Sequence, residues 1–166
     1  MSATVLVNLS SPQWHAVDDV LERVSQAVLA TLEAEGRAME PVEVGVLLTD
    51  DQESLTLNLQ HRGLNRPANV LSFAMEDGEE FPEPESGPVL LGDIVIPYET
   101  TVAEATPLGL SVEARLLHLA VHGVLHLLGY DHERSPIEAE KQEKQEIAIL
   151  ARLGIANPYD LPLKPE

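Results

Sequence analysis

The sequence predicts an α+β domain in which a small mixed β-sheet of about four strands is covered by helices. Four short, mostly apolar runs are typical of strands, and longer segments carry apolar residues at helical spacing. The two kinds of segment mix without strict alternation, which favours a mixed sheet. With 166 residues, 44% of them apolar, a single domain over residues 1–166 can bury a substantial core.

The chain is predicted to begin with a strand at residues 4–8, followed by a helix. Ser11 before Pro12 is typical of a helix N-cap with proline at the first helical position. Apolar residues then recur at helical spacing from Trp14 onward, and Gly36 ends the segment. We therefore expect one continuous helix between Ser11 and Gly36.

Three further strands and a short helix are expected in the middle of the chain. Residues 42–48 are mostly apolar, which favours a strand in the interior of the sheet. Residues 49–52 resemble a capping box that opens a helix running to about residue 60. Residues 70–73 and 89–96 have the composition of the remaining strands.

Residues 75–88 join the last two predicted strands and carry much of the acidic charge. The segment contains six acids together with two glycines and three prolines, so we expect a flexible solvated loop. A regulatory or partner-binding acidic tract is the alternative interpretation.

Two helices are predicted in the last third of the chain. Ser111 opens the first, and Glu113 lies in its first turn, where the helix dipole favours an acid. This helix is apolar on all sides, which is typical of a buried helix. Ser135 starts a capping box with proline at the first helical position, and the charged amphipathic helix that follows ends at Gly154.

Composition limits the compartment and the kinds of metal site. There is no cysteine, so disulfides, thiolate zinc sites and cysteine nucleophiles are excluded, and a metal must be bound by His, Asp or Glu. No apolar run is long enough to span a bilayer, and the N-terminal residues lack the pattern of a signal peptide. These features predict a cytoplasmic protein without a membrane partner.

The charge of the chain is strongly acidic. Ten basic and 28 acidic residues give a formal net charge of −18, whereas a protein that binds phosphates usually shows a basic surface. Net charge does not describe a local cleft, however, so it does not decide between ligands.

Three histidines have the spacing of a metal site. His122 and His126 lie four residues apart, so both imidazoles project from one face of a helix. Gly129 is a natural helix terminator, and the turn it allows can return His132 to the first two rings. Three imidazoles leave one position of a tetrahedral Zn²⁺ site open for water, which is typical of catalytic zinc, although nickel or cobalt would suit the same donors.

A metal also explains how imidazoles are tolerated in so apolar a segment. Buried rings without partners would be costly, whereas a shared ion satisfies them. His118 lies one turn before His122, but a straight helix cannot bring all of these rings to one ion. We interpret His118 as a core residue or as a donor that fixes its neighbours, and Asp131 as either a similar support or a turn residue.

The spacing of the histidines is that of metzincin-type zinc peptidases, with one important difference. Those enzymes have Glu directly after the first histidine as general base, and this chain has Gly123. A peptidase mechanism therefore lacks its base.

Residues 122–132, His-Gly-Val-Leu-His-Leu-Leu-Gly-Tyr-Asp-His, resemble the signature of the YbeY family of bacterial metallo-endoribonucleases. Three other segments are similar to the family pattern: residues 57–63 leading into 70–73, residues 91–96, and the tail around residues 153–159. The resemblance spans about residues 42 to 159.

The resemblance implies a zinc-dependent endoribonuclease that acts on single-stranded rRNA. It implies roles in rRNA maturation, including the 3′ end of 16S rRNA, and in ribosome quality control. The expected partners are rRNA and the small ribosomal subunit with its proteins, not DNA. Carried over to this sequence, His122, His126 and His132 would bind one Zn²⁺, and Arg62 and His122 would be the catalytic residues. An arginine fork can hold a phosphodiester and stabilise its developing charge.

The sequence leaves several points open. The family pattern has Thr-Asp where this chain has Ala68-Asn69, which affects the positioning of the neighbouring loop. Asp131, Glu133 and the zinc-bound hydroxide itself are candidates for managing the proton. The attacking group would be either a zinc-activated water or the 2′-hydroxyl of the RNA. Two other functions also remain: a metal-dependent hydrolase with another substrate, and a zinc-stabilised ribosome-assembly factor that binds without cutting.

Overall fold

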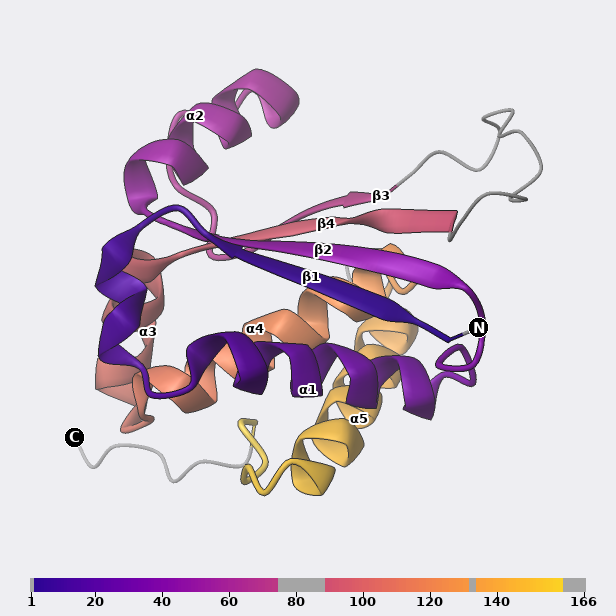
Figure 1. Ribbon diagram of the computed structural model, residues 1–166. Coiled ribbons are helices and arrows are strands. Elements are labelled where there is room, and N and C mark those ends of the chain that lie inside the picture. The colour runs from indigo at the N-terminus through magenta and orange to yellow at the C-terminus, as the bar shows by residue number, and fades with distance from the viewer. Residues whose placement is uncertain (1, 75–88, 132–133, 160–166) are drawn as a thin grey trace.

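A four-stranded mixed sheet lies at the centre of the molecule, as predicted (Figure 1). The computed structural model describes residues 2–74, 89–131 and 134–159, so the predicted acidic loop at residues 75–88 lies outside the described residues. The strand order is β1-β2-β4-β3, and β3 alone runs antiparallel to its neighbour. The strands are β1 (Thr4–Leu9), β2 (Val42–Thr49), β3 (Leu71–Ala74) and β4 (Val89–Pro97).

Helices cover both faces of this sheet, but unequally. The bounds are α1 (Val20–Ala34), α2 (Asp51–Arg62), α3 (Tyr98–Leu108), α4 (Val112–Leu127) and α5 (Pro136–Arg152). Helices α1, α4 and α5 lie on one face, α2 lies on the other, and α3 lies at the end of the sheet where β4 finishes (Figure 1). The main core therefore fills the space between the sheet and helices α1, α4 and α5.

The first helix is not continuous, which corrects the prediction of one helix from Ser11 to Gly36. A short 3₁₀ helix, η1 (Pro12–Ala16), comes first, and α1 starts only after Asp19, whose left-handed φ of 53° turns the chain. The cause is Trp14, which is fully buried and donates from Nε1 to the carbonyl of Thr49 at 2.9 Å. This anchor holds η1 at the end of β2.

Helix α3 was not predicted because its capping groups come from elsewhere in the chain. Pro97 occupies its N-cap position and Pro107 lies within its last turn, and both disfavour a helix locally. The amide of Thr100 instead donates to Asp51 Oδ1 at 3.0 Å, and the amide of Asp51 donates to Glu99 Oε1 at 2.9 Å. The starts of α2 and α3 thus cap each other across the fold.

The three remaining helices begin at capping residues close to those predicted. Ser111 and Ser135 accept hydrogen bonds from the amides three residues later, as expected for α4 and α5. For α2 the cap is Asp50, which accepts from the amide of Glu53, while Thr49 is the last residue of β2. All three helix starts are therefore set by local sequence.

Helix α4 is buried, as its apolar sequence predicts, and Gly123 lies close to the sheet. A Cβ atom there would lie 3.0 Å from Ile94 Cγ2 and 3.1 Å from Val70 Cγ2. The hydroxyl of Ser72 on β3 donates to the carbonyl of Gly123 at 3.1 Å. This contact fixes the position of α4, and hence of its histidines, on the sheet.

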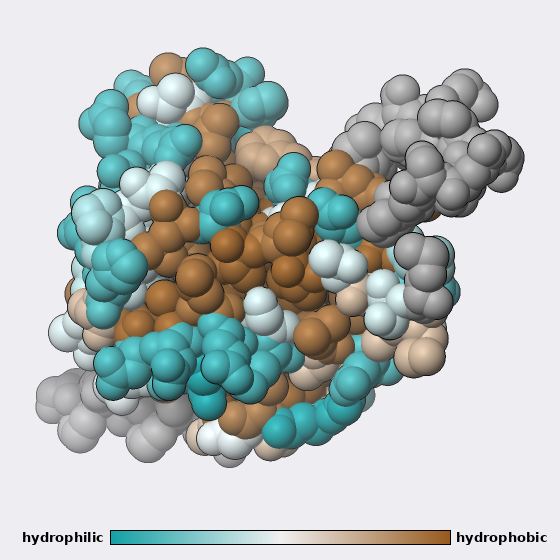
Figure 2. All heavy atoms as spheres, in the orientation of Figure 1, coloured by the Kyte–Doolittle hydropathy of each residue, from teal (hydrophilic) through white to brown (hydrophobic). Residues whose placement is uncertain are grey.

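Figure 2 shows apolar surface along the middle of the face on which β1 and α1 lie in Figure 1, with hydrophilic residues over α2. Leu6 on β1 and Leu21 on α1 are among the large apolar residues that are exposed. Among the described helices, none alone is long and apolar enough to cross a membrane. Only α3 and α4 together meet that test, as a pair bent by 112°.

We predict that Gly123→Val lowers the free energy of unfolding by about 1–3 kcal/mol, because the new side chain overpacks the contact with Ile94 and Val70. Urea denaturation measures this loss. Ala148→Val, on the exposed side of α5, is the control for valine in a helix. Equal effects of the two substitutions would contradict a close approach at Gly123.

Candidate metal centre

His122 and His126 lie on the last turns of α4, one helical turn apart, as the sequence predicts. The helix ends at Leu127, and Gly129 adopts a φ of 108°, which produces the predicted change of direction. His132 lies outside the described residues, so its return to the other two rings stays a prediction. Within the described ranges, no group of three potential ligands converges on one point.

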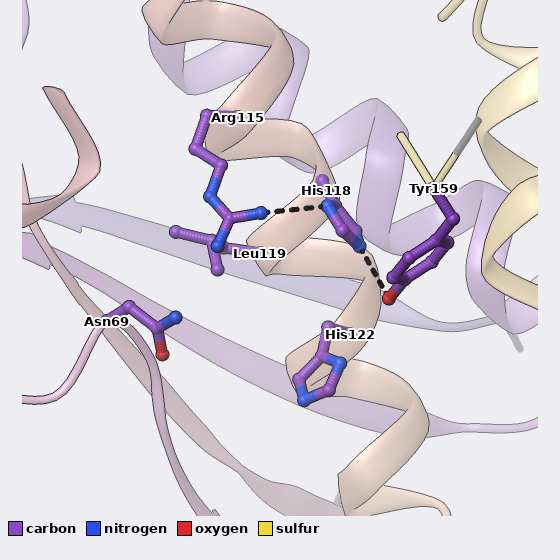
Figure 3. Close-up of a pocket in the computed structure, with 6 residues that line it drawn as sticks. All are labelled: Asn69, Arg115, His118, Leu119, His122 and Tyr159. Carbon is purple, nitrogen blue, oxygen red and sulfur yellow. Dashed lines mark hydrogen bonds between the residues drawn. The ribbon is translucent and has the colours of Figure 1, made fainter. Parts of the chain in front are cut away.

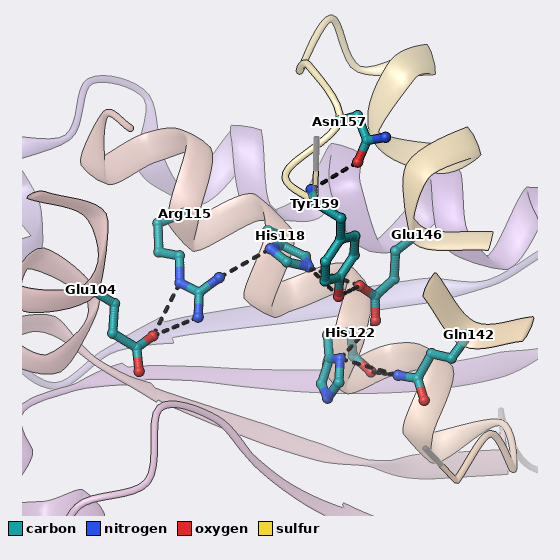
Figure 4. Close-up of polar contacts among 8 residues, drawn as sticks. All are labelled: Glu104, Arg115, His118, His122, Gln142, Glu146, Asn157 and Tyr159. Atoms are coloured by element: carbon teal, nitrogen blue, oxygen red, sulfur yellow. Dashed lines mark hydrogen bonds and ion pairs between the residues drawn. The ribbon is translucent and has the colours of Figure 1, made fainter. Parts of the chain in front are cut away.

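A buried carboxylate from α5 supports the histidines of α4 (Figure 4). The Glu146 side chain is completely buried, and its Oε2 atom lies 2.7 Å from His122 Nδ1. Its Oε1 atom lies 2.8 Å from His118 Nε2 and also accepts from the Tyr159 hydroxyl. One carboxylate therefore contacts two imidazoles and a phenol.

These contacts keep Glu146 ionised. Burial by itself would raise the pKa of Glu146, but hydrogen bonds from His118, His122 and Tyr159 outweigh burial and lower it to about 2. The pKa of Tyr159 is raised by burial and by its hydrogen bond to the same carboxylate, so its hydroxyl stays protonated and donates. The site thus contains a buried negative charge at neutral pH.

A second carboxylate extends this network to α3. Glu104 Oε1 accepts from Arg115 Nε at 3.0 Å and from Nη2 at 2.7 Å. The third nitrogen, Arg115 Nη1, lies 3.1 Å from His118 Nδ1. Arg115 therefore joins Glu104 to the histidine that contacts Glu146 (Figure 4).

A pocket of about 160 Å³ lies next to His122 (Figure 3). One face of α4 forms part of its wall, and the loop before β3 and the C-terminal segment complete it. The lining residues are Asn69, Arg115, His118, Leu119, His122 and Tyr159. A substrate group therefore has space beside the first predicted metal ligand.

The predicted functional arginine, Arg62, is exposed and ends α2 on the other face of the sheet. Within the described part of the chain it has no hydrogen-bond or ion-pair partner, and the structure does not bring it into contact with the histidines. The edge strand β3 connects the two regions, because Ser72 bonds to Gly123 of α4 and the Phe73 ring packs against His61.

Asn69, where the chain departs from the family pattern, lies beside Glu104. Its Nδ2 atom is 3.3 Å from Glu104 Oε1 and 3.2 Å from Oε2. An aspartate at this position would face the carboxylate of Glu104, whereas the amide donates to it. In this chain the negative charge next to Arg115 comes from α3 instead. Arg66, in the same loop, has an exposed side chain, and its carbonyl accepts from Asn58.

The structure also explains why Gly123 does not carry the base of a metzincin. Its Cα–H side faces Ile94, Val70 and the hydroxyl of Ser72, not the side of α4 that carries His122. A glutamate there would be directed into the sheet. The peptidase interpretation therefore loses its geometry as well as its base.

The sequence-based prediction missed Glu146, Arg115 and Glu104. The signal for Glu146 was present, because Gln142 and Glu146 share a helical stripe with Ile149 and Leu150, and all four are buried. A charged residue on the apolar stripe of an amphipathic helix indicates a buried partner. His118, interpreted as support for its neighbours, does act within the network, through Glu146.

We predict that Asn69→Asp lowers the free energy of unfolding by about 1 kcal/mol at neutral pH, because two carboxylates would meet at Glu104. In a double-mutant cycle, Glu104→Gln should recover much of this loss, with a coupling energy of about 0.5–3 kcal/mol measured by urea denaturation. Additive effects of the two substitutions would contradict direct contact between these positions.

Comparison with known proteins agrees with the signature in residues 122–132. The family model described as "Endoribonuclease YbeY" matches residues 8–154. A protein named endoribonuclease YbeY from Magnetococcus marinus is 52% identical over 128 residues, covering 75% of this chain and 87% of the relative. The relative of that name from Rhodospirillum rubrum is 49% identical over 161 residues, covering 92% of this chain and 80% of that relative.

A solved structure has the same fold. The solution structure of a protein from Thermotoga maritima superposes with a TM-score of 0.54, at 22% sequence identity, over 98% of this chain and 99% of the other. The match to the family model and the identity to these relatives show the family. This chain belongs to the YbeY family of endoribonucleases.

Proposed function

We propose that this endoribonuclease is zinc-dependent and cleaves single-stranded rRNA during maturation, including at the 3′ end of 16S rRNA. The proposal rests on the surroundings of His122: its ring contacts the buried Glu146 carboxylate and lines an open pocket. The proposal places the chain in the cytoplasm, where it would act on rRNA and require neither DNA nor a membrane.

The donor set fits zinc. His122, His126 and His132 would hold the ion, because catalytic zinc sites commonly have three protein ligands and a fourth position open for water. A histidine that binds a metal commonly donates its other ring N–H to a carboxylate, and Glu146 lies 2.7 Å from His122 Nδ1. When bound, zinc supplies an activated water at neutral pH and polarises a phosphoryl oxygen.

The residues of the chain would bind and orient the RNA. Arg62 is an exposed cation at the end of α2, and we propose that it binds the phosphodiester. His61 is the neighbouring basic residue. The backbone of the RNA would cross the edge at β3, between α2 and α4. The pocket beside His122 would receive a group that flanks the scissile bond.

The chain offers Asp131 for the proton. It lies in the turn after α4, half-buried, and its carbonyl accepts from the amide of Arg134. Glu133, the other candidate, lies outside the described residues. Products that end in a 2′,3′-cyclic phosphate would indicate attack by the RNA's own 2′-hydroxyl, and 5′-phosphate ends would indicate attack by water.

A second candidate function follows from the charge. A net charge of −18 suits contacts with basic ribosomal proteins of the small subunit, in assembly or quality control, even without cleavage. A factor that only binds would lose ribosome association and folding together when zinc is removed, whereas an enzyme would lose cleavage.

We predict that Arg62→Glu reduces cleavage of a labelled single-stranded rRNA fragment by about 100-fold or more, because the transition-state charge loses its cation. Bound zinc and urea stability should stay unchanged. Lys144→Glu, an exposed residue on α5, is the matched charge control. Undiminished cleavage by Arg62→Glu would refute the role of Arg62.

Zinc removal gives a separate test. Stripping the metal should abolish cleavage, and adding zinc should restore it to the wild type but not to His126→Ala, because that variant lacks one predicted ligand. Equal residual cutting by wild-type, stripped and variant protein would indicate a contaminating nuclease and would favour the factor that binds without cutting.

A further inference from the structure

We propose that Glu146 is a positioning residue that locks His122 in the tautomer able to bind a metal through Nε2, and that Arg115 and His118 hold Glu146 in place. The inference rests on the proposed function only in taking His122 as a metal ligand. It follows from counting donors and acceptors along one chain of contacts (Figure 4).

The count starts at Arg115, whose guanidinium can only donate hydrogen bonds. Its Nε and Nη2 atoms donate to Glu104 Oε1, and its Nη1 atom lies 3.1 Å from His118 Nδ1. His118 Nδ1 must therefore be the acceptor. In a neutral imidazole the proton then resides on Nε2.

His118 passes this constraint to Glu146. Its Nε2–H lies 2.8 Å from Glu146 Oε1, and the hydroxyl of Tyr159 donates to the same oxygen. The ring of Tyr159 also packs edge-on against His118 at 5.3 Å between centroids. Two donors on Oε1 fix the plane of the carboxylate and direct Oε2 toward α4.

The carboxylate in turn determines the proton on His122. The side chain of Glu146 is completely buried, and its carboxylate can only accept hydrogen bonds; its Oε2 atom lies 2.7 Å from His122 Nδ1. The proton must reside on Nδ1. In the neutral ring Nε2 then carries the lone pair that a metal requires.

Among the described residues, Gln142 is the group that competes at this nitrogen. Its Nε2 atom lies 3.2 Å from His122 Nδ1 and 3.4 Å from the His122 carbonyl, so as a donor to Nδ1 it would favour the opposite tautomer. The carboxylate contact is shorter and charge-assisted, and such bonds are roughly twice as strong as neutral ones. The amide therefore bonds to the carbonyl, and Glu146 decides the tautomer.

The first test measures zinc affinity by competition with a chelator. Glu146→Gln presents an amide that cannot accept from both histidines, because one of its two terminal atoms is a donor. We expect zinc affinity to fall by about 10- to 100-fold. Glu143→Gln, an exposed change of the same kind on α5, should leave affinity unchanged. Unchanged affinity in Glu146→Gln would overturn the proposal.

The second test determines the tautomer in the wild-type protein. Imidazole ¹⁵N resonances of the metal-free wild type distinguish the two tautomers of the neutral ring. Loss of one pair of signals in His122→Ala assigns His122. We expect a protonated Nδ1 and an unprotonated Nε2; the reverse, or averaging between the two, would overturn the proposal.

A third variant tests the outer part of the chain of contacts. Arg115→Met removes the donor to His118 Nδ1, so we expect the ¹⁵N resonance of that nitrogen to shift while the proton stays on Nε2, with a smaller loss of zinc affinity than in Glu146→Gln. An unaltered His118 spectrum would contradict the role of Arg115. None of these measurements uses RNA, so failure of the proposed nuclease function would be seen separately, as absence of cleavage by the zinc-loaded wild type.

Discussion

The buried carboxylate of Glu146 is the interaction on which the rest of the site depends. An ionised group with no exposed surface is costly unless it is fully hydrogen-bonded, and here His118, His122 and Tyr159 supply the donors. These donors come from α4 and from the segment after α5. The carboxylate therefore joins two helices and the C-terminal segment while it orients the first predicted metal ligand.

The sheet sets the geometry around this carboxylate. Gly123 lets α4 approach Ile94 and Val70 closely, so His122, one position earlier, turns away from the sheet and toward the pocket. Because successive residues of a strand face opposite sides, Ser72 contacts α4 and Phe73 contacts the end of α2. The short edge strand β3 therefore contacts both α4, which carries His122 and His126, and the end of α2, which carries the exposed Arg62.

Local signals predicted the parts of the fold that local sequence controls. Ser111 and Ser135 cap their helices with their own side chains, and the glycine after α4 produces the expected turn. Helix α3 was not predicted because Asp51, far away in the sequence, caps it. The spacing of the histidines predicted that His122 and His126 lie one turn apart on α4, whereas the contact between Arg115 and Glu104 could not be predicted, since only the packing of α3 against α4 brings them together.

The crystal structure of the zinc-loaded protein would test the account most directly, because it shows which atoms bind the metal and which atoms contact the metal-binding histidines. We expect zinc on Nε2 of His122 with His126 and His132, each at about 2.0–2.1 Å, and Glu146 on His122 Nδ1 without touching the ion. Zinc bound through Nδ1 of His122, or directly by Glu146, would contradict the account.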